Sequence, residues 1–261
     1  MVFFLESLMF RSLLDLICPP SCAICRQSLE VDDDISLCMA CRTKIATVDG
    51  GFCVRCGGRK FQRLDDTGDC RRCMTTPFRF HRVIALGEYE HDLRLTILRM
   101  KSDRSGFLAT AIAAWLVERR RKLLEESGAD VIVPIPMHQV RRWLRGVNNP
   151  DLLAAEIARR LGRPILRNVV WRTRRTKLQF PLSRLGRTEN VEGAFAVVPR
   201  RSRLLRNKNV LLVDDILTTG ATCNEVAAVL YAAGAKSVTV CVAARAEGNT
   251  IQLQKKPIMV K

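Results

Sequence analysis

An acidic pair and a threonine-rich turn stand side by side in the stretch VLLVDDILTTGAT, residues 210–222. The carboxylates of Asp214 and Asp215 can ligate a metal, act as acid and base, or accept hydrogen bonds from sugar hydroxyls. The turn offers hydroxyl groups and successive backbone N–H groups, which suit a phosphate. Its residues are Thr218, Thr219, Gly220, Ala221 and Thr222. A phosphate on the turn, with vicinal hydroxyls on the acidic pair, describes a ribose 5-phosphate.

The flanking sequence predicts the elements that must position these groups. The apolar run 210–213 has the length and β-branched content of a strand buried on both faces, as in a parallel sheet covered by helices. The acids then lie at its carboxyl end, where ligands bind in open α/β sheets, and a helix at 223–233 begins just beyond the turn. A second buried strand at 237–244 completes a βαβ unit, so the sheet is at least partly parallel.

The remainder of the chain after Phe78 alternates helices and strands. We expect helices at 91–101 and 107–126, and a third that starts with a cap at residues 148–151 and ends at Gly162. Further strands are expected at 131–133 and 165–171. The predicted fold class is therefore α/β with a mostly parallel sheet.

Eight of the eleven cysteines form four CxxC pairs near the start of the chain. The pairs are Cys22/Cys25, Cys38/Cys41, Cys53/Cys56 and Cys70/Cys73. Two such turns brought together complete a tetrahedral four-sulfur zinc site, so we predict two structural Zn²⁺ ions. The similar spacings leave open whether the pairs combine sequentially or in a crossed arrangement. A closed shell of four thiolates has no position for a substrate, so these sites are expected to hold a small domain together.

The charge of the chain is strongly uneven. The formal net charge is +17, yet residues 1–76 carry ten basic and ten acidic residues, so the whole excess lies in 77–261. Residues 137–208 alone carry 18 basic and 4 acidic residues. This segment predicts an anionic partner, and single-stranded nucleic acid bound without sequence preference is one hypothesis. The segment has few aromatic residues, so base stacking should add little.

The first residues give a poor export signal. Residues 1–17 are apolar but interrupted by Glu6, Arg11 and Asp15, and they read as a short amphipathic helix. No run reaches the roughly 18 apolar residues that a transmembrane helix needs. We therefore expect a cytoplasmic protein whose thiols stay reduced and free for metal. Three regions follow: residues 1–76 with this helix and a double zinc ribbon, residues 77–250 with the α/β domain, and a basic tail at 251–261.

The stretch VLLVDDILTTGAT resembles the phosphoribosyl pyrophosphate (PRPP) signature of type I phosphoribosyltransferases. Together with the cysteine pairs, it makes nearly the whole chain similar to the ComF family of competence-associated proteins. VPIPMHQVRRWLRGVNN, residues 133–149, is similar to the family's strand and following basic loop. Gln179, Arg187, Asn190 and Phe195 fit a further family pattern. The chain departs from the family at residues 145–149, where RGVNN stands in place of an RGFNQ-like run.

The resemblance implies a type I phosphoribosyltransferase-like fold with a small N-terminal zinc ribbon, and it implies roles for individual residues. Asp214 and Asp215 become the candidate catalytic residues, which contact the ribose 2′ and 3′ hydroxyls, and residues 218–222 cradle the 5-phosphate. The basic loop is implied to meet Mg²⁺-pyrophosphate, and residues 174–190 are implied to form a mobile hood. The residues concerned are Arg141, Arg142 and Arg145 in the loop, and Lys177 and Gln179 in the hood.

The expected function follows from this ligand. Loss of pyrophosphate from the ribose C1 develops positive charge on the sugar, so a protein base is not obligatory when the acceptor is already nucleophilic. We expect a PRPP-binding protein associated with DNA uptake that transfers a 5-phosphoribosyl group to an unidentified acceptor. The alternatives are a PRPP sensor without catalysis, or a module that holds single-stranded nucleic acid for the DNA-uptake machinery. A zinc-ribbon nucleic-acid binder is less favoured, because residues 1–76 are neutral overall.

Overall fold

The computed structural model describes residues 19–30, 34–46, 52–58, 70, 73, 76–137, 147–174, 186 and 190–246. Within this part of the chain, four parallel strands form a sheet in the order β1-β6-β5-β2. Their bounds are β1 Arg82–Glu88, β2 Val131–Pro134, β5 Asn209–Leu217 and β6 Ser237–Arg245. The predicted α/β class with a mostly parallel sheet is confirmed.

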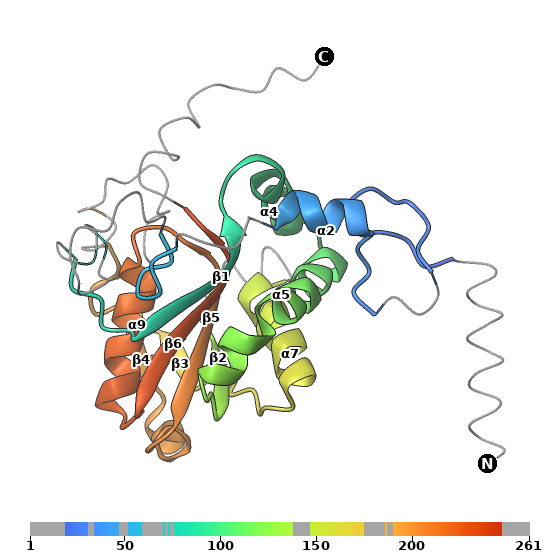
Figure 1. The fold of residues 1–261 in the computed structure, drawn as a ribbon. Coiled ribbons are helices and arrows are strands. Elements are labelled where there is room, and N and C mark those ends of the chain that lie inside the picture. Colours follow the sequence, from blue (N-terminus) through green and yellow to red (C-terminus); the bar gives the residue numbers. More distant parts are fainter. Residues whose placement is uncertain are drawn as a thin grey trace, which may run out of the picture.

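Helices cover both faces of the sheet, as Figure 1 shows. One face carries α4 (His91–Ser102), α5 (Phe107–Glu126) and α7 (Asn149–Leu161), and the other carries α9 (Ala221–Ala232). Each face of the sheet has its own hydrophobic core, and strand β5 contributes side chains to both. Leu211 and Val213 pack with α4, α5 and α7, while Leu212 packs with α9. This burial on both faces explains why β5 begins as a continuous apolar run.

The three helices expected before residue 165 form at the predicted positions. Helix α7 follows Asn148, carries Pro150 in its first turn and ends at Gly162, whose φ of 61° is the left-handed conformation that glycine adopts without strain. Helix α5 begins after Gly106 (φ 74°), where a Cβ atom would lie 2.5 Å from the side chain of Leu152. The start of α5 is therefore set by close packing against α7.

Two predicted strands differ from the observed ones. The expected strand at 165–171 is wrong for most of its length, because Asn168 adopts a left-handed φ of 60° that ends extended structure. Only Ile165 forms an isolated bridge, and β3 (Val170–Arg172) then pairs antiparallel with β4 (Phe195–Val197). In contrast, β5 runs four residues beyond Val213 to Leu217, since its pairing with β6 continues that far.

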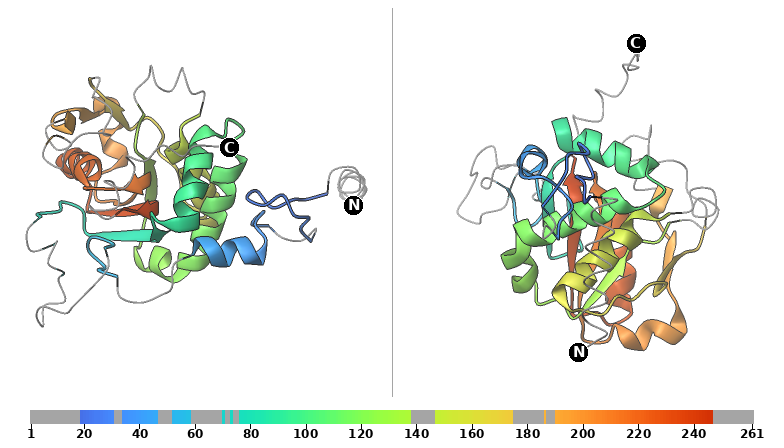
Figure 2. Two further views of the ribbon diagram at one scale, coloured as in Figure 1. Left: turned by 90° about the horizontal axis from the view of Figure 1, so that it is seen from above. Right: turned by 90° about the vertical axis from the view of Figure 1, so that its right-hand side faces the viewer.

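The cysteine-rich segments pack on opposite cores of the sheet domain. Residues 19–30 and 34–46, which include the short helix α2 (Met39–Ile45), lie beside α4 and α5, whereas residues 52–58 lie beside β1 (Figure 2). Cys22 and Cys41 share the core of α4, α5 and α7, while Cys53 and Cys56 share the core of α9. Both segments are thus buried against the α/β fold.

Some expectations fall outside the described residues: the helix at 1–17 and the tail at 251–261. The division of the chain into regions at residues 76 and 250 stays a prediction. In the described ranges, no helix is both long and apolar enough to cross a membrane.

Candidate ribose phosphate site and metal centres

The acidic pair lies in the last part of β5, near the carboxyl edge of the sheet. Asp214 pairs in register with Val242 of β6, so it is held by the sheet rather than by a loop. The backbone N–H of Asp215 donates to Asp214 Oδ1 at 2.8 Å, and the N–H of Ile216 donates to Asp215 Oδ1 at 2.7 Å. These bonds orient both carboxylates before any ligand arrives.

Lys101, the second-last residue of α4, reaches this pair. Its Nζ lies 3.2 Å from Asp215 Oδ2. Burial raises the pKa of Asp214 well above its usual range, the carboxylate of Asp215 raises it further, and Lys101 only partly offsets both. The two acids thus have different surroundings: the pKa of Asp214 is raised, while Asp215 has a cation beside it. Lys101 was not predicted from the sequence as a site residue. It lies in the last turn of a helix more than a hundred residues before the acids, so no local pattern indicates that it reaches them.

The threonine turn connects β5 to α9. Gly220 has a φ of 87° and immediately precedes the first residue of α9, and Ala221 N–H donates to Thr219 Oγ1 at 3.3 Å. A Cβ atom on Gly220 would lie 2.9 Å from the ring of Phe78, so packing as well as backbone conformation requires glycine here. The first turn of α9 contains no acidic residue. Its N-terminal N–H groups and helix dipole thus favour an anion at this turn.

Arg245, the last residue of β6, is a second residue that sequence reasoning missed. It is 1% exposed, and its Nη1 donates to the carbonyl oxygens of Leu217 and Thr218 at 2.8 and 2.6 Å. These carbonyls form the start of the threonine turn. A charged residue directly after the apolar run 237–244 was the available signal. Cys223 is buried in the α9 core, where burial and then Asp214 raise its thiol pKa.

The residues implied for pyrophosphate and the hood lie outside the described part of the chain. They are Arg141, Arg142, Arg145, Lys177 and Gln179. The structure brings together the acidic pair, the threonine turn and Lys101, which form the ribose phosphate end of the candidate site.

The cysteines gather into two tetrads, and each tetrad consists of two neighbouring CxxC pairs. The tetrads are Cys22, Cys25, Cys38, Cys41 and Cys53, Cys56, Cys70, Cys73. All sulfurs in a tetrad lie within 4.8 Å of one another, with separations such as 3.7 Å for Cys25–Cys38 and 3.6 Å for Cys53–Cys73. Four thiolates at about 2.3 Å from Zn²⁺ would be about 3.8 Å apart. The residues therefore fit two structural zinc ions, with the pairs combined sequentially.

The thiols within each tetrad differ in acidity. Burial raises the pKa of Cys22, but backbone hydrogen bonds from Cys25, Cys38 and Ile24 outweigh it and lower the pKa to about 6. In the second tetrad, burial is likewise outweighed at Cys53, whose pKa falls to about 7, whereas burial raises the pKa of Cys56 to about 11. Zinc binds all four as thiolates, so metal binding at either tetrad releases protons.

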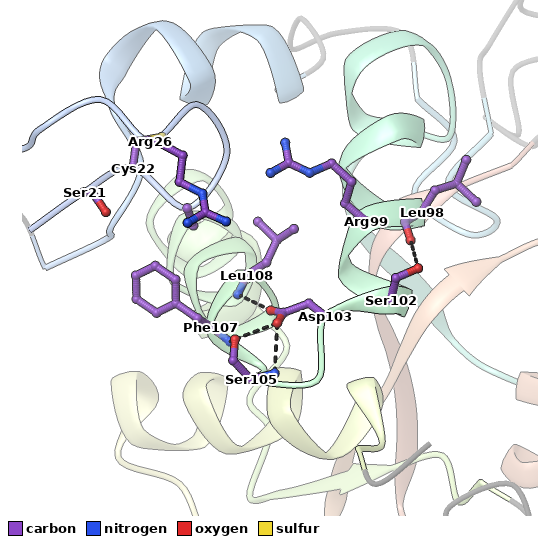
Figure 3. Close-up of a pocket in the computed structure, with 11 residues that line it drawn as sticks. Ser21, Cys22, Arg26, Leu98, Arg99, Ser102, Asp103, Ser105, Phe107 and Leu108 are labelled. Carbon is purple, nitrogen blue, oxygen red and sulfur yellow. Dashed lines mark hydrogen bonds between the residues drawn. The ribbon is translucent and has the colours of Figure 1, made fainter. Parts of the chain in front are cut away.

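A cavity of about 620 Å³ lies between the first tetrad and helices α4 and α5 (Figure 3). Arg26 and Arg99 face it from opposite walls. Asp103, at the floor of the cavity, accepts hydrogen bonds from the backbone N–H and the hydroxyl of Ser105 and from the backbone N–H of Leu108. The bond from Leu108 satisfies an N–H group in the first turn of α5. The acidic pair and the threonine turn do not line this cavity, so it is separate from the candidate ribose phosphate site.

Two family models match parts of this chain. Residues 152–261 match the phosphoribosyl transferase domain, which includes the acidic pair and the turn. Residues 13–74 match the double zinc ribbon domain, which includes both tetrads.

Similar proteins align over most of the chain. Competence protein F of Haemophilus influenzae is 28% identical over 86% of this chain and 96% of its own length. DNA utilization protein YhgH of Escherichia coli O157:H7 is 30% identical over 85% of this chain and 95% of its own length. Competence protein ComFC of Bacillus subtilis is 25% identical over 77% of this chain and 80% of its own length. The chain belongs to the ComF family, in which a double zinc ribbon is joined to a phosphoribosyl transferase domain.

Proposed function

We propose that the chain binds PRPP, with the ribose hydroxyls on Asp214 and Asp215 and the 5-phosphate on residues 218–222. The observation that carries this proposal is the acidic pair on β5 placed just before the N-terminus of α9. Carboxylates suit the diol, and helix N–H groups with threonine hydroxyls suit the phosphate. The match to the phosphoribosyl transferase domain supports the same ligand.

The proposed reaction transfers the 5-phosphoribosyl group to a nucleophile. The bond between the ribose C1 and a pyrophosphate oxygen breaks, that oxygen keeps the electron pair, and a lone pair of the acceptor forms the new bond to C1. Positive charge that develops on the sugar is stabilised by the carboxylates of the acidic pair. The ribose diol competes with Lys101 for Asp215, which frees the ammonium group of Lys101 beside an anionic ligand.

Mg²⁺ enters the proposal as the counterion of the pyrophosphate, whose departing charge it neutralises. Arg141, Arg142 and Arg145 are the residues proposed to meet it, with Lys177 and Gln179 in the hood. A cytoplasmic location, where thiols stay reduced, belongs to the same proposal.

Calorimetric titration with Mg²⁺-PRPP tests the binding step. Two charge-assisted hydrogen bonds are worth about 1.5–3 kcal/mol each, so Asp214→Asn with Asp215→Asn should weaken binding about a hundredfold or more. The matched control is Glu118→Gln with Glu125→Gln, which removes two carboxylates from the exposed side of α5 and should leave the affinity unchanged. Zinc content should stay the same in both variants. Equal affinity of the acidic-pair variant and the control would contradict the assignment.

Pyrophosphate release then separates an enzyme from a sensor. The zinc-loaded protein is incubated with Mg²⁺-PRPP and candidate nitrogen bases. Release that depends on a base supports phosphoribosyl transfer. Tight binding without release would instead favour the PRPP sensor.

A second candidate function, binding of single-stranded nucleic acid, is favoured by one surface. The 3-10 helix η1 (Pro199–Leu204) contains no buried residue and presents three exposed arginines. They are Arg200, Arg201 and Arg203. Arg201 Nη1 donates to the carbonyl of Arg167, which brings η1 close to the β3 strand where Trp171 is 46% exposed. Exposed cations suit a phosphate backbone. Relatives named for competence and DNA utilization make DNA the proposed ligand.

Fluorescence anisotropy with a labelled single-stranded oligonucleotide tests this surface. Binding should weaken with salt by about 0.7 in log affinity per unit of log salt for each phosphate neutralised. Replacing Arg200 and Arg203 with Ala should reduce that slope, whereas Trp171→Ala should change the affinity little, because base stacking is expected to add little. PRPP affinity should not change in these variants. Undetectable binding at low salt would remove this function and leave the PRPP proposal intact.

A further inference from the structure

A buried arginine joins the second cysteine tetrad to the threonine turn. Arg245 is 1% exposed, and burial of a guanidinium is costly unless its donors are used. Its Nη1 donates to the carbonyls of Leu217 and Thr218 at the start of the turn. Its Nε donates to the carbonyl of Cys56, a cysteine of the second tetrad, at 2.8 Å. One rigid side chain therefore holds the backbone of both sites.

The planarity of the guanidinium makes this link directional. Its N–H groups have fixed relative directions, so a shift of the Cys56 carbonyl must be followed by the arginine or must break a hydrogen bond. The arginine in turn contacts the carbonyls that orient the threonine turn. A lysine would keep the charge but has no planar fork, so it could not hold three carbonyls in the same geometry.

The segment around Cys56 is packed so closely that it has little freedom to move independently. Gly57 has a φ of 68°, and a Cβ atom there would lie 2.8 Å from Val83 and 3.6 Å from Arg245. Val83 N–H also donates to the carbonyl of Val54 at 3.0 Å, which attaches the CxxC turn to β1. A metal shared by the four thiolates would join this turn to the other CxxC pair of the tetrad, and it would restrict the position of the Cys56 carbonyl further.

A second contact runs from the same tetrad to the same turn. Phe78 follows Cys73 by five residues, and its ring stacks on Phe80 at 4.9 Å between centroids. The ring of Phe78 also lies where a side chain on Gly220 would be. The backbone N–H of Arg79 donates to Asn224 Oδ1 in the first turn of α9. The threonine turn thus packs against chain that leads directly out of the second tetrad.

We propose that Arg245 is a positioning residue that couples metal occupancy of the second tetrad to phosphate binding at residues 218–222. Each ligand then strengthens the binding of the other, because coupling between two sites is reciprocal. The proposal rests on the proposed function, since the turn must bind the 5-phosphate of PRPP. The coupling factor typical of such links is about 5–150-fold.

Zinc release to a coloured chelator, measured on the full zinc-loaded chain, tests the coupling. All four cysteines of the second tetrad are buried, whereas Cys25 of the first is exposed, so the slow phase of release belongs to the second tetrad. Saturating Mg²⁺-PRPP should slow this phase about fivefold or more and leave the fast phase unchanged. PRPP binding is measured in parallel by calorimetry.

Two variants identify the route. Arg245→Lys should retain two zinc ions per chain but lose the effect of PRPP on the slow phase. Arg160→Lys, which alters a contact of the first tetrad, should keep that effect. If PRPP binds and the slow phase of the wild-type chain does not change, the coupling is overturned while the proposed function stands. If PRPP does not bind, the proposed function and the coupling are both contradicted. If Arg245→Lys loses zinc on purification, the effect of PRPP on the slow phase of the wild-type chain still decides whether the two sites are coupled. If zinc-loaded Arg245→Lys keeps the PRPP effect, Arg245 is not the residue that couples them.

Discussion

The two cysteine tetrads have the same ligands but different surroundings. The first tetrad is held by side chains of the scaffold: Arg99 of α4 donates to the carbonyl of Ile24, and Arg160 of α7 binds Asp34 at 2.8 Å. The second tetrad is held through Arg245 and β1, beside the threonine turn. Identical metal chemistry can therefore stabilise a distant part of the fold in one place and a ligand site in another.

Two carboxylates of the described residues also differ: Glu156, joined through Arg160 to Asp34 of the first cysteine segment, and Asp214 of the acidic pair. Glu156 of α7 is buried and binds Arg159 and Arg160, whose hydrogen bonds outweigh the effect of burial and lower its pKa. Asp214 has its pKa raised by burial and by Asp215. The pKa of Glu156, which Arg160 joins to the first cysteine segment, is thus lowered, while the pKa of Asp214 in the acidic pair is raised.

The largest effects should come from matched cysteine replacements. Cys22→Ser and Cys53→Ser each remove a buried ligand and should each lose one zinc ion, with a loss of binding free energy on the order of 10 kcal/mol. PRPP affinity should fall at least tenfold in Cys53→Ser and stay within about twofold in Cys22→Ser. Metal analysis and calorimetric titration of the soluble proteins measure both. An equal loss of PRPP affinity would show that the tetrads do not differ in this respect.

Glu156→Gln should destabilise the fold without affecting the ligand. Removing one partner from a buried ion pair costs about 3–5 kcal/mol, measured by urea unfolding at neutral pH. Since the pKa of Glu156 is lowered by folding, its stabilisation is complete above the unfolded value of about 4.3 and is lost as pH falls through the lower folded pKa. The difference from wild type should therefore shrink in acid. The exposed Glu118→Gln is the control and should change stability by less than about 0.5 kcal/mol.

Asp214 should give the opposite pH dependence. Its raised pKa means that the folded state keeps a proton above the unfolded value of about 3.9, so folded stability falls as pH rises from there through the folded pKa. A ribose hydroxyl donates a stronger hydrogen bond to a deprotonated carboxylate than to a carboxylic acid, so PRPP affinity should rise with pH and level off above the folded pKa. Titrations across pH should show this rise in wild type and a flatter profile in Asp214→Asn. Identical profiles would count against a ligand role for Asp214.

Lys101→Met should have the smallest effect on stability. The Lys101–Asp215 pair is partly exposed, so its loss should change the free energy of unfolding by less than about 1 kcal/mol. Helix α4 also packs on the first tetrad, which makes Lys101 the contact most able to connect that tetrad to the acidic pair. We expect zinc release from the first tetrad to stay independent of PRPP in both wild type and variant. If PRPP slows zinc release from the first tetrad in wild type and this effect disappears in Lys101→Met, the first tetrad is also coupled to the acidic pair. The proposed difference between the two tetrads would then be wrong.

Much of the fold and the ribose phosphate end of the site could be predicted from contiguous residues. Gly162 ends α7 because local φ and ψ decide a helix end, and the acidic pair stands before the threonine turn because both belong to one strand and its loop. The strand expected at 165–171 failed for a local reason that composition concealed. Asn168, in the middle of the segment ILRNVVW, takes a left-handed conformation, which asparagine tolerates better than most residues, and the apolar residues on either side favoured a continuous strand.

What the sequence alone determined was the chemistry of each short segment: paired thiols that suit zinc, an acidic pair, and a glycine turn before a helix. The tertiary structure decided which segments meet. It joined neighbouring cysteine pairs into sequential tetrads, brought Lys101 to Asp215, and placed Arg245 between the carbonyls of Cys56 and Thr218. Contacts between residues so far apart depend on how helices and strands pack across two cores, and similar spacings in the chain are compatible with more than one such packing.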